Sequence, residues 1–146
     1  MARIKIQFPD HFDFVTEIPI RITDLNYGGH LGNDIALSLL HEARVRFLRY
    51  HGFTEHDISG VGILMTDSAL VYKSEGFYGD TLQVEVGTKD FTRVGCDVVY
   101  RMTRKADGQE IVRAKTGIVF YDYERKRVVR LPEVFRRAME EGKPVA

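Results

Sequence analysis

Cysteine, an excess of charge of one sign and long hydrophobic runs are all scarce in this sequence. Its single cysteine, Cys96, excludes an internal disulfide framework and any zinc site built on cysteines, and favours a reducing compartment. The 21 Lys and Arg residues balance 21 Asp and Glu residues, so no net field attracts nucleic acid or acidic membranes. Residues 1–12 lack the apolar run of a signal peptide or membrane anchor, so we expect a cytoplasmic protein that binds neither nucleic acid nor membrane.

The sequence shows no internal repeat or low-complexity tract, and since its four prolines are scattered along the chain, nothing marks a linker. The length of 146 residues and the 44% of hydrophobic residues suit one soluble domain with a real core, over residues 1–146. No set of histidines and acids has the spacing of metal ligands, so we expect no metal site.

The first half of the chain predicts a strand, a loop and a long helix. Residues 15–23 alternate apolar and polar side chains, which indicates a strand, and Pro19 indicates an edge position or a strand end. Residues 24–33 contain three glycines and two asparagines, which favour a shaped loop. Apolar residues recur at helical spacing over residues 33–51 and predict one long helix.

The ends of this helix and the remaining elements follow from similar signals. Asn33 or Asp34 is the expected N-cap, and Gly52 the expected stop. A short amphipathic helix is predicted over residues 132–141. Between the helices we expect four antiparallel strands, over residues 61–73, 81–92, 96–104 and 110–123. The chain is therefore predicted to be an α+β domain with one long helix on a curved antiparallel sheet of about five strands.

Several motifs follow this order. Residues Arg21 to Asn33 read RITDLNYGGHLGN, and Leu39 to Leu48 read LLHEARVRFL. These stretches resemble the R-x-x-D-x-D-x-x-G-H-x-N-N loop and the E-E-A-R helix of hotdog-fold acyl-CoA thioesterases of the 4-hydroxybenzoyl-CoA thioesterase type. Val71 to Val86 is similar to that family's Y-x-x-E-x-x-x-G-D-x-L-x-V strand pair, Ile111 to Asp122 to its last long strand and Leu131 to Arg136 to its closing segment.

The resemblance implies a hotdog fold and a homodimer or homotetramer whose sites lie between subunits. It implies a small acyl-CoA substrate, with coenzyme A present as part of the substrate and no further cofactor. It also implies that backbone N–H groups around Gly29, Leu31 and Asn33, at the positive end of the long helix, bind the thioester carbonyl oxygen.

The sequence departs from the family at both positions where its members carry a catalytic acid. The loop position is Asn26 and the helix position is His41. Asn26 can orient substrate or water through its amide but cannot act as a base at neutral pH. His41 can, because an imidazole titrates near working pH.

The other candidate site residues can have a structural role as well as a functional one. Asp24 is a reserve catalytic candidate, but an aspartate also suits a tight turn. Asp34 flanks the other end of the same loop and is a second reserve candidate. Asp67 is a candidate to reach substrate in the site of a neighbouring subunit. His30 either touches substrate or locks the loop by hydrogen bonds.

Two further residues have simpler interpretations. Glu42 reaches the site only if the helix register differs from the one that the family motif implies. Otherwise it suits an ion pair on the helix surface with Arg46 or Arg49, because i,i+4 spacing favours Glu before Arg. Cys96 is interpreted as a small strand residue and not as a nucleophile.

The function predicted first is hydrolysis of an acyl- or aryl-CoA thioester to free acid and CoA. One alternative is a non-catalytic acyl-CoA-binding hotdog protein, because acids are missing at positions 26 and 41. The other is an enoyl-CoA hydratase or dehydratase that uses His30 with Asp34 or Asp24. The acyl group, the general base, the choice between dimer and tetramer, and the basic residues that bind CoA phosphates are left open.

Overall fold

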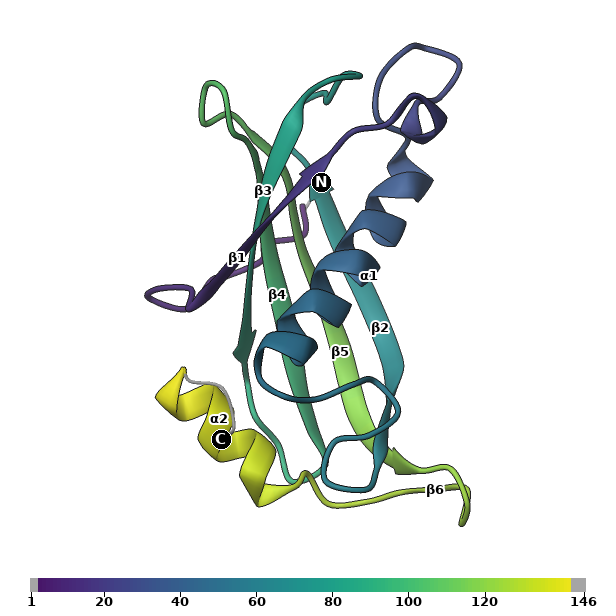
Figure 1. Cartoon of the computed structure of the whole chain (residues 1–146), viewed down its shortest axis with the longest axis vertical. Coiled ribbons are helices and arrows are strands. Elements are labelled where there is room, and N and C mark those ends of the chain that lie inside the picture. The colour runs from purple at the N-terminus through teal and green to yellow at the C-terminus, as the bar shows by residue number, and fades with distance from the viewer. Residues whose placement is uncertain (1–2, 143–146) are drawn as a thin grey trace.

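A long helix, α1 (Asn33–Tyr50), lies against one face of an antiparallel sheet in the computed structural model, which describes residues 3–142 (Figure 1). The sheet order is β1-β3-β4-β5-β2, with the short β6 beside β5. The strands are β1 (Phe14–Pro19), β2 (Gly62–Tyr72), β3 (Thr81–Lys89), β4 (Gly95–Arg104), β5 (Glu110–Asp122) and β6 (Arg127–Val128). The predicted α+β class is confirmed, and the strand ends differ from the predicted ones by at most a few residues.

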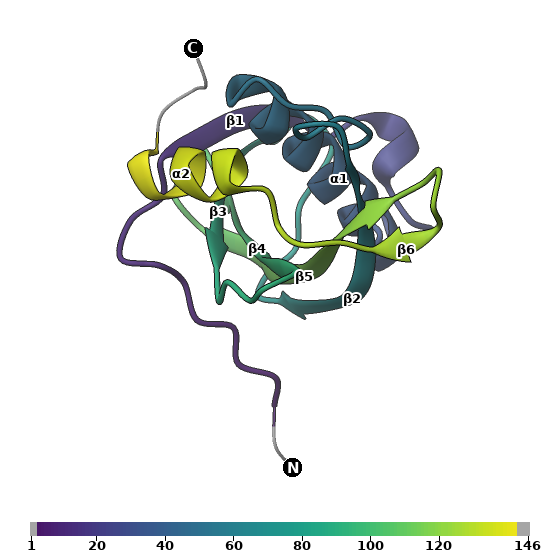
Figure 2. The same ribbon diagram turned by 90° about the horizontal axis from the view of Figure 1, so that it is seen from below.

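The core lies between α1 and the concave face of the sheet, which curls around the helix (Figure 2). The apolar stripe predicted from the helical spacing is buried, and it includes Leu39, Leu40, Ala43 and Phe47. At 20–33 cal/mol per Å² of apolar surface removed from water, this stripe is the main force that docks the helix.

The expected N-cap of α1 is wrong. Gly32 takes the N-cap position in an extended conformation, and no side chain caps the helix. The N–H of Gly32 donates to the carbonyl oxygen of Asp24, which fixes the backbone at the point where the helix begins. The predicted stop agrees with the structure, since Gly52 follows the C-cap residue with a φ of 89°.

The first strand is shorter than predicted. It ends at Pro19, on an edge strand as Pro19 indicated, and residues Ile22–Asp24 form a 3-10 turn, η1. The Asp24 carboxylate accepts hydrogen bonds from the backbone N–H of Arg21 at 2.7 Å and from its guanidinium at 3.0 Å. This local pair turns the chain away from the sheet before the alternating pattern ends.

A bulge in β2 decides which of its side chains face α1. Met65 pairs with Ile118 and Asp67 with Gly117, so Thr66 is an extra residue between them. Residues directly opposite one another share a face of the sheet. Met65 therefore faces α1, Asp67 faces outward and Ser68, opposite Thr116, faces α1 again.

The outer face of the sheet is covered in part by the N-terminal segment, which runs on the side opposite α1 (Figure 2). Ile6 of this segment is buried, and the Phe8 ring lies 4.3 Å from the Arg113 guanidinium carbon. At the end of the curled sheet, α2 (Glu133–Glu141) buries Phe135 against Phe53 and Phe120. The predicted C-terminal helix is confirmed, with Pro132 as its N-cap.

Candidate active site

The loop between η1 and α1 is shaped by its own hydrogen bonds. The Asn26 side-chain oxygen accepts from the backbone N–H of Gly28 at 2.9 Å and of His30 at 3.4 Å. Gly29 adopts a φ of 83°, which glycine tolerates without strain. The side chain of Asn26 thus holds the turn together, which is the structural role that an asparagine in a tight turn usually has.

The backbone donors expected to bind a carbonyl oxygen are placed differently from the prediction. The N–H groups of Gly29 and Leu31 donate to the carbonyl oxygens of Asn26 and Gly76, at 3.0 and 2.7 Å. They are therefore already satisfied within the fold. Within residues 3–142, the N–H groups from Asn33 to Ile35 have no hydrogen-bond acceptor, as expected in the first turn of a helix. Of the predicted donors, only Asn33 has a free N–H group.

These free donors lie beside a hollow of about 240 Å³ at the start of α1. The Tyr72 hydroxyl of β2 donates to the carbonyl oxygen of Asn33 at 3.0 Å and joins the edge strand to the helix start. The hollow is lined by the loop before α1, the chain after β2 and β5, through His30, Leu31, Asn33, Ala36, Gly76 and Ile111. It offers an electropositive helix end together with apolar walls.

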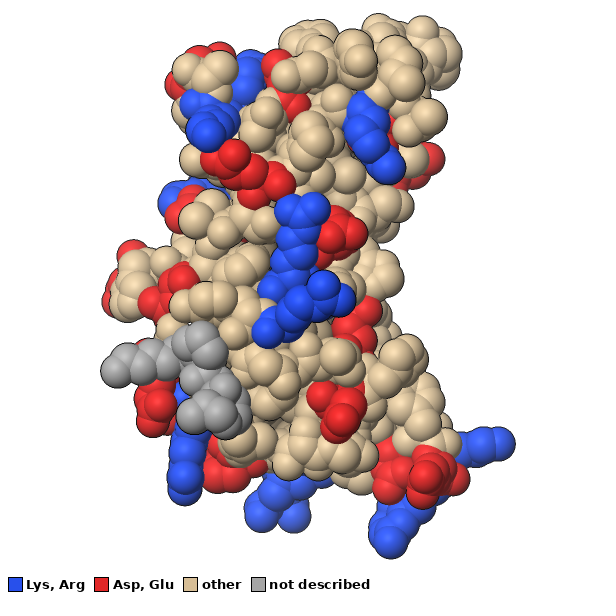
Figure 3. All heavy atoms as spheres, viewed as in Figure 1, with Lys and Arg blue, Asp and Glu red and all other residues tan. Residues whose placement is uncertain are grey.

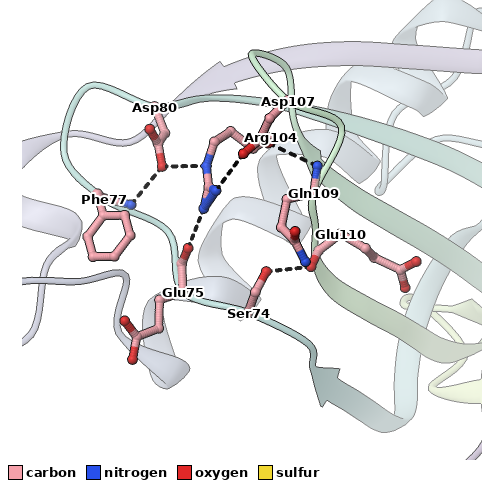
Figure 4. A network of polar contacts seen from close by, with 8 residues as sticks. All are labelled: Ser74, Glu75, Phe77, Asp80, Arg104, Asp107, Gln109 and Glu110. Atoms are coloured by element: carbon pink, nitrogen blue, oxygen red, sulfur yellow. Dashed lines mark hydrogen bonds and ion pairs between the residues drawn. The ribbon is translucent and has the colours of Figure 1, made fainter.

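Arg104 at the end of β4 holds the segment from Ser74 to Asp80, which forms one wall of this hollow (Figure 4). Its guanidinium donates to the carbonyl oxygen of Glu75 at 2.7 Å and to the Asp80 carboxylate at 3.1 Å. The same Asp80 carboxylate accepts from the backbone N–H of Phe77 at 2.9 Å. One half-buried cation therefore fixes both the backbone and the turn of the wall.

His30 joins the two loops. Its Nε2 lies 3.7 Å from a carboxylate oxygen of Glu75, and its ring packs edge-on against Phe77. The end of the molecule that carries these loops shows few charged side chains on the face drawn in Figure 3. Its exposed large apolar residues include Ile22, Tyr27 and Tyr78.

His41 lies farther along α1, beside a second hollow of about 270 Å³. Leu37 and Ser38 of α1 and Met65 and Ser68 of β2 also line this hollow, so it lies between the helix and the edge strand. The imidazole is 57% exposed, and a substrate or water can reach it from this side.

The other side of the His41 ring contacts a series of hydrogen-bonded polar side chains that runs into the core. His41 Nε2 lies 2.7 Å from one carboxylate oxygen of Glu55, and Arg44 donates to the other oxygen at 2.7 Å. Arg44 also donates to the Tyr100 hydroxyl at 3.1 Å, which is 2.7 Å from the Thr116 hydroxyl. Arg44, Tyr100 and Thr116 are all buried.

Burial raises the pKa of the Glu55 carboxyl, but hydrogen bonds from Arg44 and His41 outweigh it and lower the pKa below its ordinary value. Glu55 is therefore a carboxylate at neutral pH. Glu55 lies in the loop after α1 and was not among the site residues predicted from the sequence. Its only sequence signal was an acid just past the helix stop at Gly52.

The remaining candidates are placed away from both hollows or are already paired. Glu42 pairs with Arg46 at 2.7 Å on the helix surface, which confirms that interpretation. Asp67 lies on the outer face and pairs with Lys115 at 2.9 Å, so any role in substrate binding requires a neighbouring subunit. Cys96 is buried, and burial raises the pKa of its thiol to about 12, as expected for a strand residue without a nucleophilic role.

Within residues 3–142, no group of three or more histidines, cysteines or acids is arranged to hold a metal ion. In the same part of the chain, no helix has the length and apolar character needed to cross a membrane.

The comparisons with known proteins agree with this architecture. The model of the thioesterase-like superfamily matches residues 20–139, and the chain belongs to that family. A search of curated proteins found no match.

Solved structures with the same fold include a 1,4-dihydroxy-2-naphthoyl-CoA thioesterase from Synechocystis, which is 18% identical, with a TM-score of 0.80 over 88% of this chain and 96% of that chain. The hypothetical protein TT1821 from Thermus thermophilus is 22% identical, with a TM-score of 0.76 over 87% and 97% of the two chains. The gentisyl-coenzyme A thioesterase BH1999 is 15% identical, with a TM-score of 0.76 over 86% and 99%. The predicted hotdog fold is confirmed.

Proposed function

We propose that this protein hydrolyses the thioester of an acyl-CoA or aryl-CoA in the cytoplasm, releasing the free acid and CoA. The observation that carries the proposal is that free helix N–H groups and an exposed histidine lie beside two hollows along the same helix, α1, in a chain of the thioesterase-like superfamily. Two solved relatives of the same fold are named for aromatic acyl-CoA substrates, which supports including aryl groups.

The reaction follows from these groups. The carbonyl oxygen accepts hydrogen bonds from the N–H groups at the start of α1, which stabilise the negative charge that develops on it. His41 takes a proton from water, and the water oxygen forms a bond to the carbonyl carbon. The C–S bond then breaks as the carbonyl re-forms, and the leaving sulfur receives the proton from the His41 imidazolium. One water and one thioester thus give one acid and one thiol.

The spacing along α1 fits this reaction. His41 lies eight residues beyond Asn33, which corresponds to about 12 Å along the helix axis. Its side chain leans toward the helix start, which shortens the gap. The steps from N–H group to carbonyl oxygen, from carbonyl carbon to water and from water to imidazole each span about 3 Å. A thioester laid along α1 between the two hollows therefore fills most of the remaining distance.

The partner that we propose is a second copy of this chain, as a homodimer or within a homotetramer. β2 is an edge strand of 11 residues whose outer side has no strand partner among the described residues. Leu64 and Met65 on it are exposed. A long apolar edge of this kind favours pairing with another strand. A second copy on β2 would also close the hollow beside His41, which explains why the site would lie between subunits.

The test is the release of free thiol from acetyl-, hexanoyl-, palmitoyl- and benzoyl-CoA by the wild type and by His41→Ala. We expect turnover of at least one substrate, and a decrease in kcat of about a hundredfold or more in the variant, because general base catalysis contributes that much. Absence of turnover with all four substrates would contradict the proposal, and bound acyl-CoA without turnover would favour the acyl-CoA-binding alternative.

Asn26→Ala tests the loop in the same assay. Since the Asn26 side chain bonds only to its own loop, we expect a higher KM and a smaller decrease in kcat than in His41→Ala. A loss in kcat equal to that of His41→Ala would instead assign Asn26 a part in the chemical step.

A further inference from the structure

Glu55 bridges the candidate base and the core. Its two carboxylate oxygens have separate partners, His41 Nε2 on one side and Arg44 Nε on the other, both at 2.7 Å. Glu55 comes from the loop after α1, 14 residues from His41, so this contact is made by the tertiary structure and not by helical spacing.

The position of Glu55 is fixed by its surroundings. Its backbone carbonyl oxygen accepts from the N–H of Ile63 at 3.1 Å, at the start of β2. Arg44 is 7% exposed and is held in turn by the Tyr100 hydroxyl at 3.1 Å. A buried arginine with these partners leaves the Glu55 carboxylate little freedom to move away from His41.

Building on the proposed hydrolysis, we infer that Glu55 is a positioning residue that holds the proton of neutral His41 on Nε2, so that Nδ1 is the atom that accepts the proton from water. A carboxylate can only accept hydrogen bonds, so the nitrogen facing it must carry hydrogen. The other nitrogen of a neutral imidazole then carries the lone pair.

The same contact stabilises the product of proton transfer. When Nδ1 takes the proton of water, His41 becomes an imidazolium, and its positive charge lies beside the Glu55 carboxylate. Glu55 itself keeps its charge, and its two oxygens stay paired with His41 and Arg44. Its negative charge is already balanced in the resting site by Arg44, so the pair does not need to reorganise during the reaction.

Glu55→Gln is the informative variant because an amide has one acceptor oxygen instead of two. The charged Arg44 makes the stronger hydrogen bond and keeps that oxygen, so the amide N–H₂ turns toward His41 and donates to Nε2. His41 then carries its proton on Nδ1, which is the wrong tautomer for the base. We expect kcat to fall about a hundredfold while KM changes less than about threefold.

Glu85→Gln is the matched control. Glu85 also pairs with an arginine at 2.7 Å and its side chain is 27% exposed, compared with 22% for Glu55, but it lies on the outer face of the sheet. We expect its kcat and KM to equal those of the wild type. Unchanged kcat in Glu55→Gln, or an equal loss in both variants, would overturn the inference.

Nitrogen-15 NMR of the histidine side chains identifies the tautomer of His41 and does not depend on enzymatic activity. We expect His41, assigned by its absence in His41→Ala, to be in the Nε2–H form in the wild type and in the Nδ1–H form in Glu55→Gln. An Nδ1–H form or a mixture in the wild type overturns the role of Glu55. Wild-type protein with the expected tautomer but no turnover would refute the proposed hydrolysis and leave the positioning of His41 established.

Discussion

Asp24 holds the segment that leads into α1 through both its side chain and its backbone. Only 2% of its surface is exposed, and its carboxylate binds both the backbone N–H and the guanidinium of Arg21. Its carbonyl oxygen also accepts from Gly32 at the start of α1. A residue predicted as a reserve catalyst therefore connects the end of the first strand to the helix that carries the free donors.

Asp24→Asn is expected to destabilise the fold by about 1–3 kcal/mol at pH 7, because the buried Asp24 side chain loses its charge and one of the two oxygens that accept hydrogen bonds from Arg21. Burial raises the pKa of Asp24, but the hydrogen bonds and charge of Arg21 outweigh it and lower the pKa below its ordinary value of 3.8. The unfolded chain therefore takes up the proton first as pH falls. The stabilisation is complete above pH 4 and is lost as pH falls through the lower pKa of the folded state.

Urea unfolding of the wild type and Asp24→Asn between pH 2 and 7 measures this difference. The difference in the free energy of unfolding between the two proteins should become smaller below pH 4. If this difference in the free energy of unfolding stays constant from pH 2 to 7, the charge of Asp24 contributes nothing to stability.

Cys96 gives a second prediction at this scale. Because burial raises the pKa of its thiol to about 12, the reactive thiolate is rare at pH 8. We expect a disulfide reagent that releases a coloured thiolate to label the folded protein at least about a hundredfold more slowly than the protein in urea. Equal rates would mean that the strand opens readily or that the thiol is exposed.

The sequence indicated Asn26 and His41 because each stands where a known motif carries an acid. It could not indicate Glu55, because nothing in the spacing shows that the loop after α1 returns to within 2.7 Å of His41. It also placed the carbonyl-binding donors at Gly29 and Leu31, whereas the fold uses those N–H groups internally. Which donors stay free depends on tertiary hydrogen bonds, such as Leu31 to Gly76, that join distant segments.

At the scale of elements, the periodic patterns predicted the long helix and the strands well, since burial of one face leaves a strong signal. The predictions that were wrong concern the ends of helices and strands. The helix begins after Gly32 without a side-chain cap, and β1 stops at Pro19 because Asp24 draws the backbone into a turn. The start of α1 and the end of β1 each depend on a single contact, and the local propensities of the residues do not predict such contacts.

Arg104 shows how one side chain supports an element of the site. In Arg104→Met, the Ser74 to Asp80 segment loses its contacts with the Glu75 carbonyl and the Asp80 carboxylate. We expect faster amide hydrogen exchange in this segment, about tenfold or more, and a higher KM with little change in kcat.

The control is Arg125→Met, which removes an exposed arginine that lies 3.8 Å from Asp122. It should change neither exchange nor KM. If exchange in the Ser74 to Asp80 segment is the same in Arg104→Met as in the wild type, Arg104 does not hold this wall.

At the scale of the whole molecule, the unpaired side of β2 predicts self-association. Light scattering should give a mass of two or four times the 16.8 kDa of the chain. Leu64→Lys places a charge on the exposed side of this edge and should raise the dissociation constant about tenfold or more, with a loss of thioesterase activity at low protein concentration.

Val128→Lys is the corresponding control, because Val128 is an exposed apolar residue on β6 rather than on β2. It should leave the mass and the activity unchanged. A wild-type mass of a single chain at high concentration would exclude a site between subunits.

The bulge at Thr66 absorbs one extra residue of β2. Ser68 and Tyr72 face α1, and Asp67 faces outward, because the extra residue is accommodated in the bulge and does not shift the alternation that follows. A deletion of Thr66 would remove the bulge itself, so Asp67 would still pair with Gly117 and Ser68 with Thr116, and the same side chains would face α1. We therefore expect related chains to tolerate the loss of this one residue, whereas one more inserted residue without a second bulge would turn every later side chain of β2 to the opposite face.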